Sequence, residues 1–249
     1  MITLKSEQEI EKMRCAGRIV RLVHTQLQKK IVPGVRLCEL DTLAERLIRA
    51  EGATPSFKGY KGFPGTICAS VDEELVHGIP DKRKLRNRQI VSIDIGACYE
   101  GYHGDSAWTY VVGDKPDEDV ERLLQTTEAA LQMGIKEARV GKRLGDISAA
   151  VEACALEEGF SIIREYAGHG IGSCLHEEPA IPNYGHAGQG MMLRPGMTFC
   201  VEPMFSLGER FVETKADGWT VVMEDGKQCA HFEHTLLVNQ EGLPEILTS

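Results

Sequence analysis

Apolar residues recur at helical spacing in four stretches of the chain, and each stretch predicts a helix. The first helix is expected to begin at Ser6, because Ser6 and Glu9 have the types and spacing of a capping box. Pro33-Gly34 follows the end of this helix, and Gly52 ends the second one. The four predicted helices cover residues 6–30, 37–51, 117–138 and 144–158.

Alternation of apolar and polar residues predicts strands elsewhere. Residues 90–96 alternate most clearly, with three apolar side chains on one face and Asp94 on the other. The other expected strands lie near residues 198–203, 219–223 and 230–238. Asp225-Gly226 marks the turn between the last two strands, and residues 51–65, rich in glycine, proline and aromatic residues, should form a loop.

The second half of the chain repeats features of the first. Gly34-x-Arg36-Leu37 before one helix corresponds to Gly141-x-Arg143-Leu144 before another, 107 residues later, and Asp94 in its strand corresponds to Glu202, 108 residues later. This offset is too long for a solenoid unit. We interpret residues 1–249 as one catalytic domain with an internal repeat of approximately 31–113 and 139–240. Chance similarity between short motifs is the alternative.

Composition narrows the functional classes. The chain has 37 acidic and 28 basic residues and a formal net charge of −9, whereas binding nucleic acid over a large surface requires a basic face. Eight cysteines are scattered without a C-x-x-C pair, which is typical of reduced thiols in a cytoplasmic protein. We find no signal peptide and no apolar run approaching ~20 residues, so we expect no membrane association.

Four carboxylates stand in strand-like apolar contexts: Asp94, Asp105, Glu202 and Glu233. Each one alone could simply face solvent on a half-exposed sheet. All four together, two of them in repeat-related positions, favour convergence on one site. Clustered carboxylates repel one another unless cations neutralise them. A carboxylate-rich ligand set with little imidazole suits Mn²⁺, Fe²⁺, Co²⁺ or Zn²⁺, so we expect two divalent ions.

Three histidines are candidates for the same site. Glycines surround His169 in Gly168-His-Gly-Ile-Gly172, so the backbone can approach a ligand there, and His176 and His77 occur in similar Gly/Pro-containing segments. The remaining histidines are expected to have ordinary structural or surface roles: His24, His103, His186, His231 and His234.

Eight segments, taken jointly, resemble the methionine aminopeptidases of peptidase family M24, specifically the compact bacterial type 1. They are Gly59-Tyr-Lys-Gly-Phe-Pro64, His77-Gly-Ile-Pro80, Ile93-Asp-Ile-Gly96, His103-Gly-Asp105, Gly168-His-Gly-Ile-Gly172, His176-Glu-Glu-Pro179, Val201-Glu-Pro-Met204 and Phe232-Glu-His-Thr235. The resemblance covers nearly the whole chain. It implies the α+β "pita-bread" fold, in which two pseudo-symmetric α/β halves surround a curved antiparallel sheet.

The resemblance also implies a metal-ligand set. Asp94 would bind one ion, Asp105 and Glu233 would bridge two, and His169 and Glu202 would complete the second. A hydroxide between the ions would then attack the peptide bond. Cobalt, manganese, iron, zinc and nickel all remain open as the bound metal.

Three residues receive catalytic roles from the same resemblance. His176 would stabilise the developing oxyanion, Glu202 would shuttle a proton to the leaving amine, and His77 would contact the substrate beside the scissile bond.

A methionine pocket is implied as well, lined by Phe57, Tyr60, Phe63, Cys68, His77, Leu175, His176 and Trp219. Aromatic rings and a thiol suit a flexible thioether, although plain core packing is the commoner role of such residues. Leu175 stands where family members often have phenylalanine, and Phe57 where a smaller residue is common. A pocket of somewhat different shape is therefore expected.

The resemblance implies removal of the N-terminal methionine from nascent proteins and peptides whose second residue is small. We expect a cytoplasmic monomer without sequence-specific nucleic-acid binding. An X-Pro peptidase, which shares the fold and ligands, and a non-catalytic binding protein on the same fold are the alternatives. The basic run Lys82–Arg88 is either a solvated loop or a transient contact to ribosomal RNA.

Overall fold

The helices begin and end close to where the sequence predicts them. In the computed structural model, which describes residues 2–249, the Ser6 N–H donates to Oε2 of Glu9 over 2.8 Å and so completes the predicted capping box. Gly159, in the left-handed region at φ 78°, follows the last helix as a C-terminal cap. The helices are α1 (Glu7–Gln28), α2 (Leu37–Ala50), α3 (Glu118–Glu137) and α4 (Leu144–Glu158).

The strands pair antiparallel throughout and divide among four sheets, with the orders β1-β4-β2 (β5 also pairs with β4), β13-β10-β6, β11-β12-β3 and β15-β14-β9-β7-β8. The first half contains β1 (Thr54–Pro55), the 3₁₀ turn η1 (Tyr60–Gly62), β2 (Ile67–Val71), β3 (Glu74–Val76), β4 (Ile90–Tyr99) and β5 (Tyr102–Val111). The second half contains β6 (Ser161–Ile162), β7 (Gly168–Gly170), β8 (Glu177–Ile181), β9 (Thr198–Val201), β10 (Met204–Ser206), β11 (Val212–Thr214), β12 (Val221–Met223), β13 (Cys229–His231), β14 (His234–Leu237) and β15 (Glu245–Ile246).

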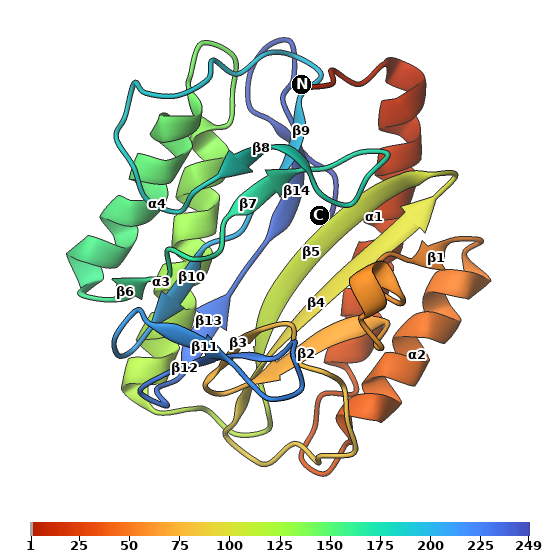
Figure 1. Ribbon diagram of the computed structural model, residues 1–249, viewed down its shortest axis with the longest axis vertical. Coiled ribbons are helices and arrows are strands. Elements are labelled where there is room, and N and C mark those ends of the chain that lie inside the picture. The colour runs from red at the N-terminus through yellow and green to blue at the C-terminus, as the bar shows by residue number, and fades with distance from the viewer. Residues whose placement is uncertain (1) are drawn as a thin grey trace.

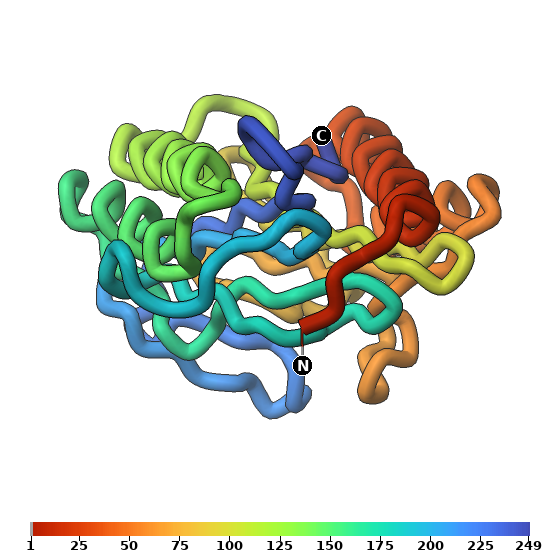
Figure 2. The backbone as a smooth tube through the Cα atoms, turned by 90° about the horizontal axis from the view of Figure 1, so that it is seen from above, coloured from red at the N-terminus to blue at the C-terminus, as the bar shows by residue number. Residues whose placement is uncertain are grey.

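Each helix pair has its own apolar core. Helices α1 and α2 pack with β2 and β4 through residues such as Leu27 and Ile93. Helices α3 and α4 pack with β9 and β10 through residues such as Val151 and Phe199. Both helix pairs lie on the same side of the strands, as the view from above shows (Figures 1 and 2). The opposite side of the strands is therefore free to carry a site.

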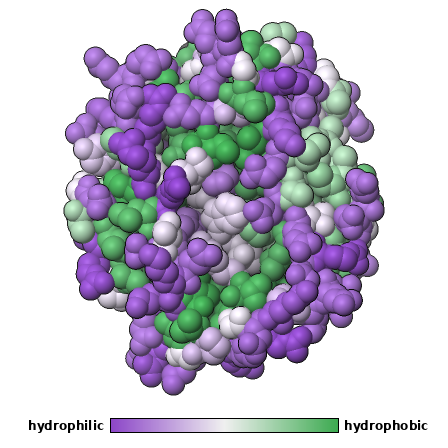
Figure 3. Space-filling view, turned by 180° about the vertical axis from the view of Figure 1, so that it is seen from behind, coloured by the Kyte–Doolittle hydropathy of each residue, from purple (hydrophilic) through white to green (hydrophobic). Residues whose placement is uncertain are grey.

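The outer face behind the strands in Figure 1 is mainly hydrophilic (Figure 3). Polar and charged side chains cover most of it, with smaller apolar areas between them. This distribution follows from the amphipathic helices, which bury their apolar stripes against the strands and turn their polar stripes outward.

The two halves share local features at the predicted offset. The Arg36 N–H donates to Glu39 at the start of α2, and the Arg143 N–H donates to Asp146 at the start of α4. Both arginines also form isolated β-bridges, Arg36 with Lys84 and Arg143 with Met192. On these paired features we propose that residues 31–113 and 139–240 are the two copies of an internal repeat within a single domain.

Two predicted strands are interrupted. The strand expected over residues 198–203 ends with β9 at Val201, because Pro203 has no N–H to donate to a neighbouring strand. The strand expected over residues 230–238 is split into β13 and β14, since the Glu233 N–H donates across to Ala107 of β5. Glu202 and Glu233 thus lie in gaps between strands, where strict alternation does not govern the direction of a side chain. The prediction that they occupy regular strands was wrong.

Candidate active site

The hairpin of β4 and β5 positions the first two carboxylates. Asp94 lies opposite Ala107 and Asp105 lies opposite Gly96. Residues directly opposite in an antiparallel pair share a face, so both carboxylates point to the same side, two positions apart. A Cβ on Gly96 would lie 2.6 Å from the Phe57 ring. The missing side chain is therefore required for that ring to approach the hairpin.

The C-terminal segment adds Glu233 through hydrogen bonds that join the two halves. The Glu233 N–H donates to the Ala107 carbonyl over 2.8 Å, and the Ser106 hydroxyl donates to the Glu233 carbonyl over 2.6 Å. The Thr235 hydroxyl accepts from the Asp105 N–H at 3.0 Å and donates to the Asp105 carbonyl at 2.7 Å. These four contacts hold Glu233 and Asp105 against each other although they are distant in sequence.

His169 and Glu202 approach the same point from the second half. The His169 Nδ1–H donates to the Gly170 carbonyl over 2.9 Å, which leaves the Nε2 lone pair free. That Nε2 lies 3.9 Å from Oδ2 of Asp105 and 3.8 Å from Oε1 of Glu202. Asn183 donates to the Glu202 carbonyl at 2.9 Å and fixes the backbone in the gap after β9.

The negative charges of the four clustered carboxylates require neutralisation. Burial, reinforced by the neighbouring acids, raises the pKa of Asp105, Glu202 and Glu233 well above its ordinary value, and burial raises that of Asp94 to about 6. Asp94, Asp105 and Glu233 each have one buried oxygen that finds no hydrogen-bond partner in the part of the chain described, residues 2–249. Buried oxygens without donors fit cations as their partners.

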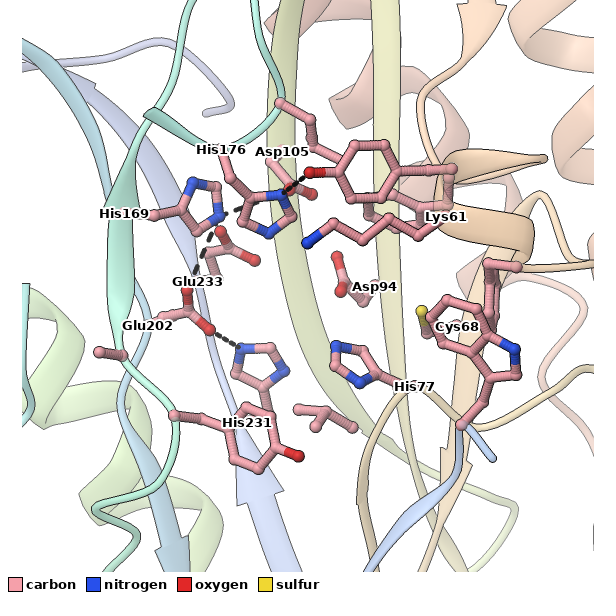
Figure 4. A pocket seen from close by; sticks show the side chains of 18 of the residues that line it. Lys61, Cys68, His77, Asp94, Asp105, His169, His176, Glu202, His231 and Glu233 are labelled. Atoms are coloured by element: carbon pink, nitrogen blue, oxygen red, sulfur yellow. Dashed lines mark hydrogen bonds and ion pairs between the residues drawn. The ribbon is translucent and has the colours of Figure 1, made fainter. Parts of the chain in front are cut away.

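All predicted site residues line one cavity of about 360 Å³ on the open side of the strands (Figure 4). The five predicted metal ligands are Asp94, Asp105, His169, Glu202 and Glu233. The eight predicted pocket residues are Phe57, Tyr60, Phe63, Cys68, His77, Leu175, His176 and Trp219. Sequence reasoning thus selected residues that the fold does bring together.

The apolar end of this cavity is closed by packed rings. The Phe63 and Trp219 rings meet edge to face with centroids 5.2 Å apart, and Trp219 likewise meets the imidazole of His77 at 6.4 Å. Cys68 and Leu175 are buried beside them. Burial lowers the pKa of His77 to about 4, so its ring is neutral at pH 7.

His176 stands at the rim of the cavity on the loop between β7 and β8. Its Nδ1 is 3.1 Å from the Tyr60 hydroxyl. Desolvation of the ring, followed by the charges of His169 and Lys61, lowers its pKa to about 3. With Nδ1 accepting from Tyr60, the neutral ring carries its proton on Nε2 and can donate it to an oxygen in the cavity.

A buried ion pair holds the His176 loop. The ammonium of Lys5 lies 2.5 Å from Oε2 of Glu177, the residue after His176. The backbone N–H of Lys5 also donates to the Gly196 carbonyl over 2.8 Å. The N-terminal segment is thereby tied to the loop that carries His176.

Comparison with known proteins places this arrangement in a family. The model of metallopeptidase family M24 matches residues 11–240. The chain belongs to this family. It is 54% identical to "Methionine aminopeptidase 1" of Bacillus subtilis (strain 168), with 100% of this chain and 99% of that protein covered.

Solved structures agree with this assignment to M24. The methionine aminopeptidase of Thermotoga maritima superposes with a TM-score of 0.97 at 46% identity, covering 100% of both chains. The prolidase of Pyrococcus furiosus has a TM-score of 0.79 at 23% identity and is covered over only 65% of its length, so it shows the fold alone. The expected pita-bread fold is confirmed.

Two residues of this M24 site were missed. His231 was expected to be an ordinary histidine, but it is buried in the cavity wall with Nε2 3.4 Å from Oε2 of Glu202 and no hydrogen-bond partner for that atom. The thiol of Cys200 groups with Asp105, His169 and Glu233, with the ligand atoms of all four within 4.8 Å of one another. Each missed residue precedes a site carboxylate by two positions, but the strands are interrupted at Glu202 and Glu233, so strand alternation gave no dependable signal for either residue.

Proposed function

We propose that this chain is a methionine aminopeptidase that removes the N-terminal methionine from nascent proteins and peptides when the second residue is small. The observation that carries the proposal is the convergence of three buried carboxylates, the half-buried Asp94 and one imidazole beside a closed apolar pocket. The carboxylate cluster suits hydrolysis assisted by two divalent ions, and the pocket suits one unbranched apolar side chain.

Asp94, Asp105, His169, Glu202 and Glu233 would hold the two ions. The unpartnered oxygens of three of these carboxylates and the free Nε2 of His169 fit that role. Two such ions, when bound, lower the pKa of water and polarise the carbonyl of the substrate. Co²⁺, Mn²⁺, Fe²⁺, Zn²⁺ and Ni²⁺ are all compatible with the oxygen-rich set.

The protein's own groups would perform the remaining steps. The Nε2–H of His176 donates to the carbonyl oxygen of the scissile bond as negative charge develops there. Glu202, whose carboxylate is buried and faces both His169 and His231, takes up a proton from water and delivers it to the leaving amine. The neutral His77 ring contacts the substrate next to the bond that breaks.

The methionine side chain would occupy the closed end of the cavity. Phe63, Cys68 and Trp219 offer it aromatic and sulfur contacts, and the buried Leu175 forms part of the wall. Phe57 narrows the pocket by packing against Gly96. A bulky, branched first residue would meet these rings and be excluded.

Peptide hydrolysis distinguishes this function from that of an X-Pro peptidase. The protein is treated with a chelator and then assayed on Met-Ala-Ser and on Gly-Pro substrates, metal-free and with added Mn²⁺ or Co²⁺. We expect metal-dependent release of methionine from Met-Ala-Ser and no cleavage of Gly-Pro. Preferential cleavage of Gly-Pro would establish the alternative, and no cleavage at any metal concentration would support a non-catalytic binding protein.

The remaining proposals concern partners and location. None of the helices within residues 2–249 has both the length and the apolar character needed to cross a bilayer. We propose that the protein works as a monomer in the cytoplasm on emerging polypeptide N-termini.

The basic run Lys82–Arg88 is proposed to make transient contact with ribosomal RNA. Arg83 is unsuitable for a test, because its guanidinium binds the buried carboxylate of Glu74 through contacts of 2.8 and 3.1 Å. Lys84 and Arg86 are exposed, and within residues 2–249 neither has a carboxylate within 4 Å. These two side chains are free to meet phosphates.

Reversing both charges, with Lys84→Glu and Arg86→Glu, is expected to reduce co-sedimentation with ribosomes several-fold in low salt, since each lost phosphate contact weakens electrostatic binding. The matched control carries Lys136→Glu in the last turn of α3 and Arg139→Glu just after this helix, both at exposed positions. Equal sedimentation of both variants and the unmodified protein would remove the proposal.

A further inference from the structure

One charged side chain of the cavity has no role in the chemistry above. Lys61 lines the cavity. Like Glu165 and His176, which also line it, Lys61 is exposed. In Figure 4 its ammonium group extends from the turn η1 into the space in front of Asp94 and His176. Lys61 is therefore placed at the mouth of the cavity.

The backbone at Lys61 is held in an unusual conformation. Its φ of 49° and ψ of 21° lie in the left-handed region, which side chains other than glycine rarely adopt. The Phe63 N–H donates to the Tyr60 carbonyl over 2.9 Å, and the Gly59 N–H donates to the Phe63 carbonyl over 2.8 Å. Such a conformation persists only where the surroundings determine it, and it concentrates at functional sites. The turn thus presents the lysine from a defined position.

The ammonium of Lys61 lies 5.3 Å from the centroid of the Tyr60 ring but forms no ion pair within residues 2–249. No carboxylate in residues 2–249 comes within 4 Å of its ammonium, whereas Lys58 in the same loop pairs with Glu45 at 2.6 Å. The exposed carboxylate at the mouth, Glu165, is itself paired with Arg210 at 3.1 Å. Among the cavity-lining residues in the described range 2–249, Lys61 is the only lysine or arginine.

The direction of the substrate decides what this charge meets. The inner end of the cavity is closed by Phe63 and Cys68, which are 4% exposed, and takes the methionine. The scissile bond lies over the carboxylates, so the rest of the peptide leaves through the mouth. Beyond the small second residue, the third and fourth residues therefore pass Lys61.

We infer that Lys61 is a specificity-determining residue that favours substrates with a carboxylate on the third or fourth residue. This inference rests on the proposed aminopeptidase function. A carboxylate there could belong to an aspartate or glutamate side chain, or to the free C-terminus of a short peptide. Either one would pair with the ammonium at the exposed mouth, where such a pair is worth a few-fold in kcat/KM.

The test compares matched peptides on the metal-loaded enzyme. Met-Ala-Asp-amide and its neutral analogue Met-Ala-Asn-amide report on the side chain, and Met-Ala-Ser with a free or amidated C-terminus reports on the terminal carboxylate. The variants are Lys61→Gln, Lys61→Glu and Lys61→Gly, of which the last also relieves the left-handed backbone. Lys58→Gln is the control, because it removes an equal charge from the same loop outside the cavity.

The enzyme is expected to prefer the Asp peptide over the Asn peptide about three-fold at low salt, mainly through KM, and to lose this preference at high salt. Lys61→Gln and Lys61→Gly should abolish the preference, Lys61→Glu should reverse it, and Lys58→Gln should retain it. A preference seen only for the free C-terminus would identify the terminal carboxylate as the group recognised.

Equal cleavage within both peptide pairs, Asp against Asn and free against amidated C-terminus, by the unmodified enzyme would overturn the inference, and so would a preference that survives in Lys61→Gln. Failure of the proposed function looks different, because then none of the methionine peptides would be cleaved by the unmodified protein.

Discussion

Replacing Asp105 with asparagine is expected to lower kcat/KM for Met-Ala-Ser by about 10³-fold or more. Asp105 is 3% exposed, and its carboxylate lies between the carboxylate of Asp94 and the imidazole of His169. If it bridges both ions, its loss disturbs both, and an effect of roughly 4 kcal/mol on the transition state corresponds to about three orders of magnitude in rate. Metal titration by calorimetry should show fewer than two ions bound.

The stability of the metal-free variant separates a site effect from misfolding. Removing one of four mutually repelling carboxylates should leave the metal-free protein at least as stable as the unmodified chain. Asp94→Asn should lose one ion and have a smaller effect on rate. Asp119→Asn, on the exposed face of α3, is the control. Two bound ions and full turnover in Asp105→Asn would contradict the assigned ligand set.

Removing the metals is expected to destabilise the protein increasingly as the pH rises from about 5 to 8. The pKa of Asp94 is raised to about 6, and those of Asp105, Glu202 and Glu233 are raised further by burial and by one another. The folded metal-free protein therefore retains protons that the unfolded chain releases near pH 4. Stability is fully present below pH 4 and is lost as the pH passes through the raised values.

Metal ions reverse this trend because they bind the deprotonated carboxylates. For Asp94 alone, a rise of about two pKa units corresponds to about 3 kcal/mol between pH 4 and 7. The measurement is urea unfolding at pH 5, 6, 7 and 8, with chelator or with excess Mn²⁺. The difference between the two unfolding free energies should grow with pH. A constant difference would mean that the ions do not bind at these carboxylates.

The helices could be predicted closely because their signals are local. The capping box of Ser6 and Glu9, the apolar spacing and the terminal glycines lie within a few residues of each boundary, and the observed helices agree within about two residues. Strand β4 was likewise indicated by the alternation around Asp94. The interruptions at Glu202 and Glu233 were not, since they depend on Pro203 and on a hydrogen bond to a strand far away in sequence.

The candidate site was likewise predicted from the sequence only in part. The residue types and the jointly specific motifs pointed to Asp94, Asp105, His169, Glu202 and Glu233. They gave no reason to separate His231 from other histidines, and a lone histidine or cysteine is usually structural. The proposed role of Lys61 could not be predicted from the sequence either, because a lysine in a glycine-rich loop is usually solvated. Only the structure shows that Lys61 lines the cavity.

The sequence by itself therefore determined the four helices, the strand around Asp94, which chemical groups are present and to which family the chain is similar, because these follow from local spacing and residue type. Only the tertiary structure decided which side chains meet. Contacts such as Thr235 with Asp105, or Glu233 with Ala107, join residues more than 100 positions apart and exist only once both apolar cores have formed. Burial then shifts the pKa of every carboxylate at the site, and these shifts cannot be predicted from any single segment of the chain.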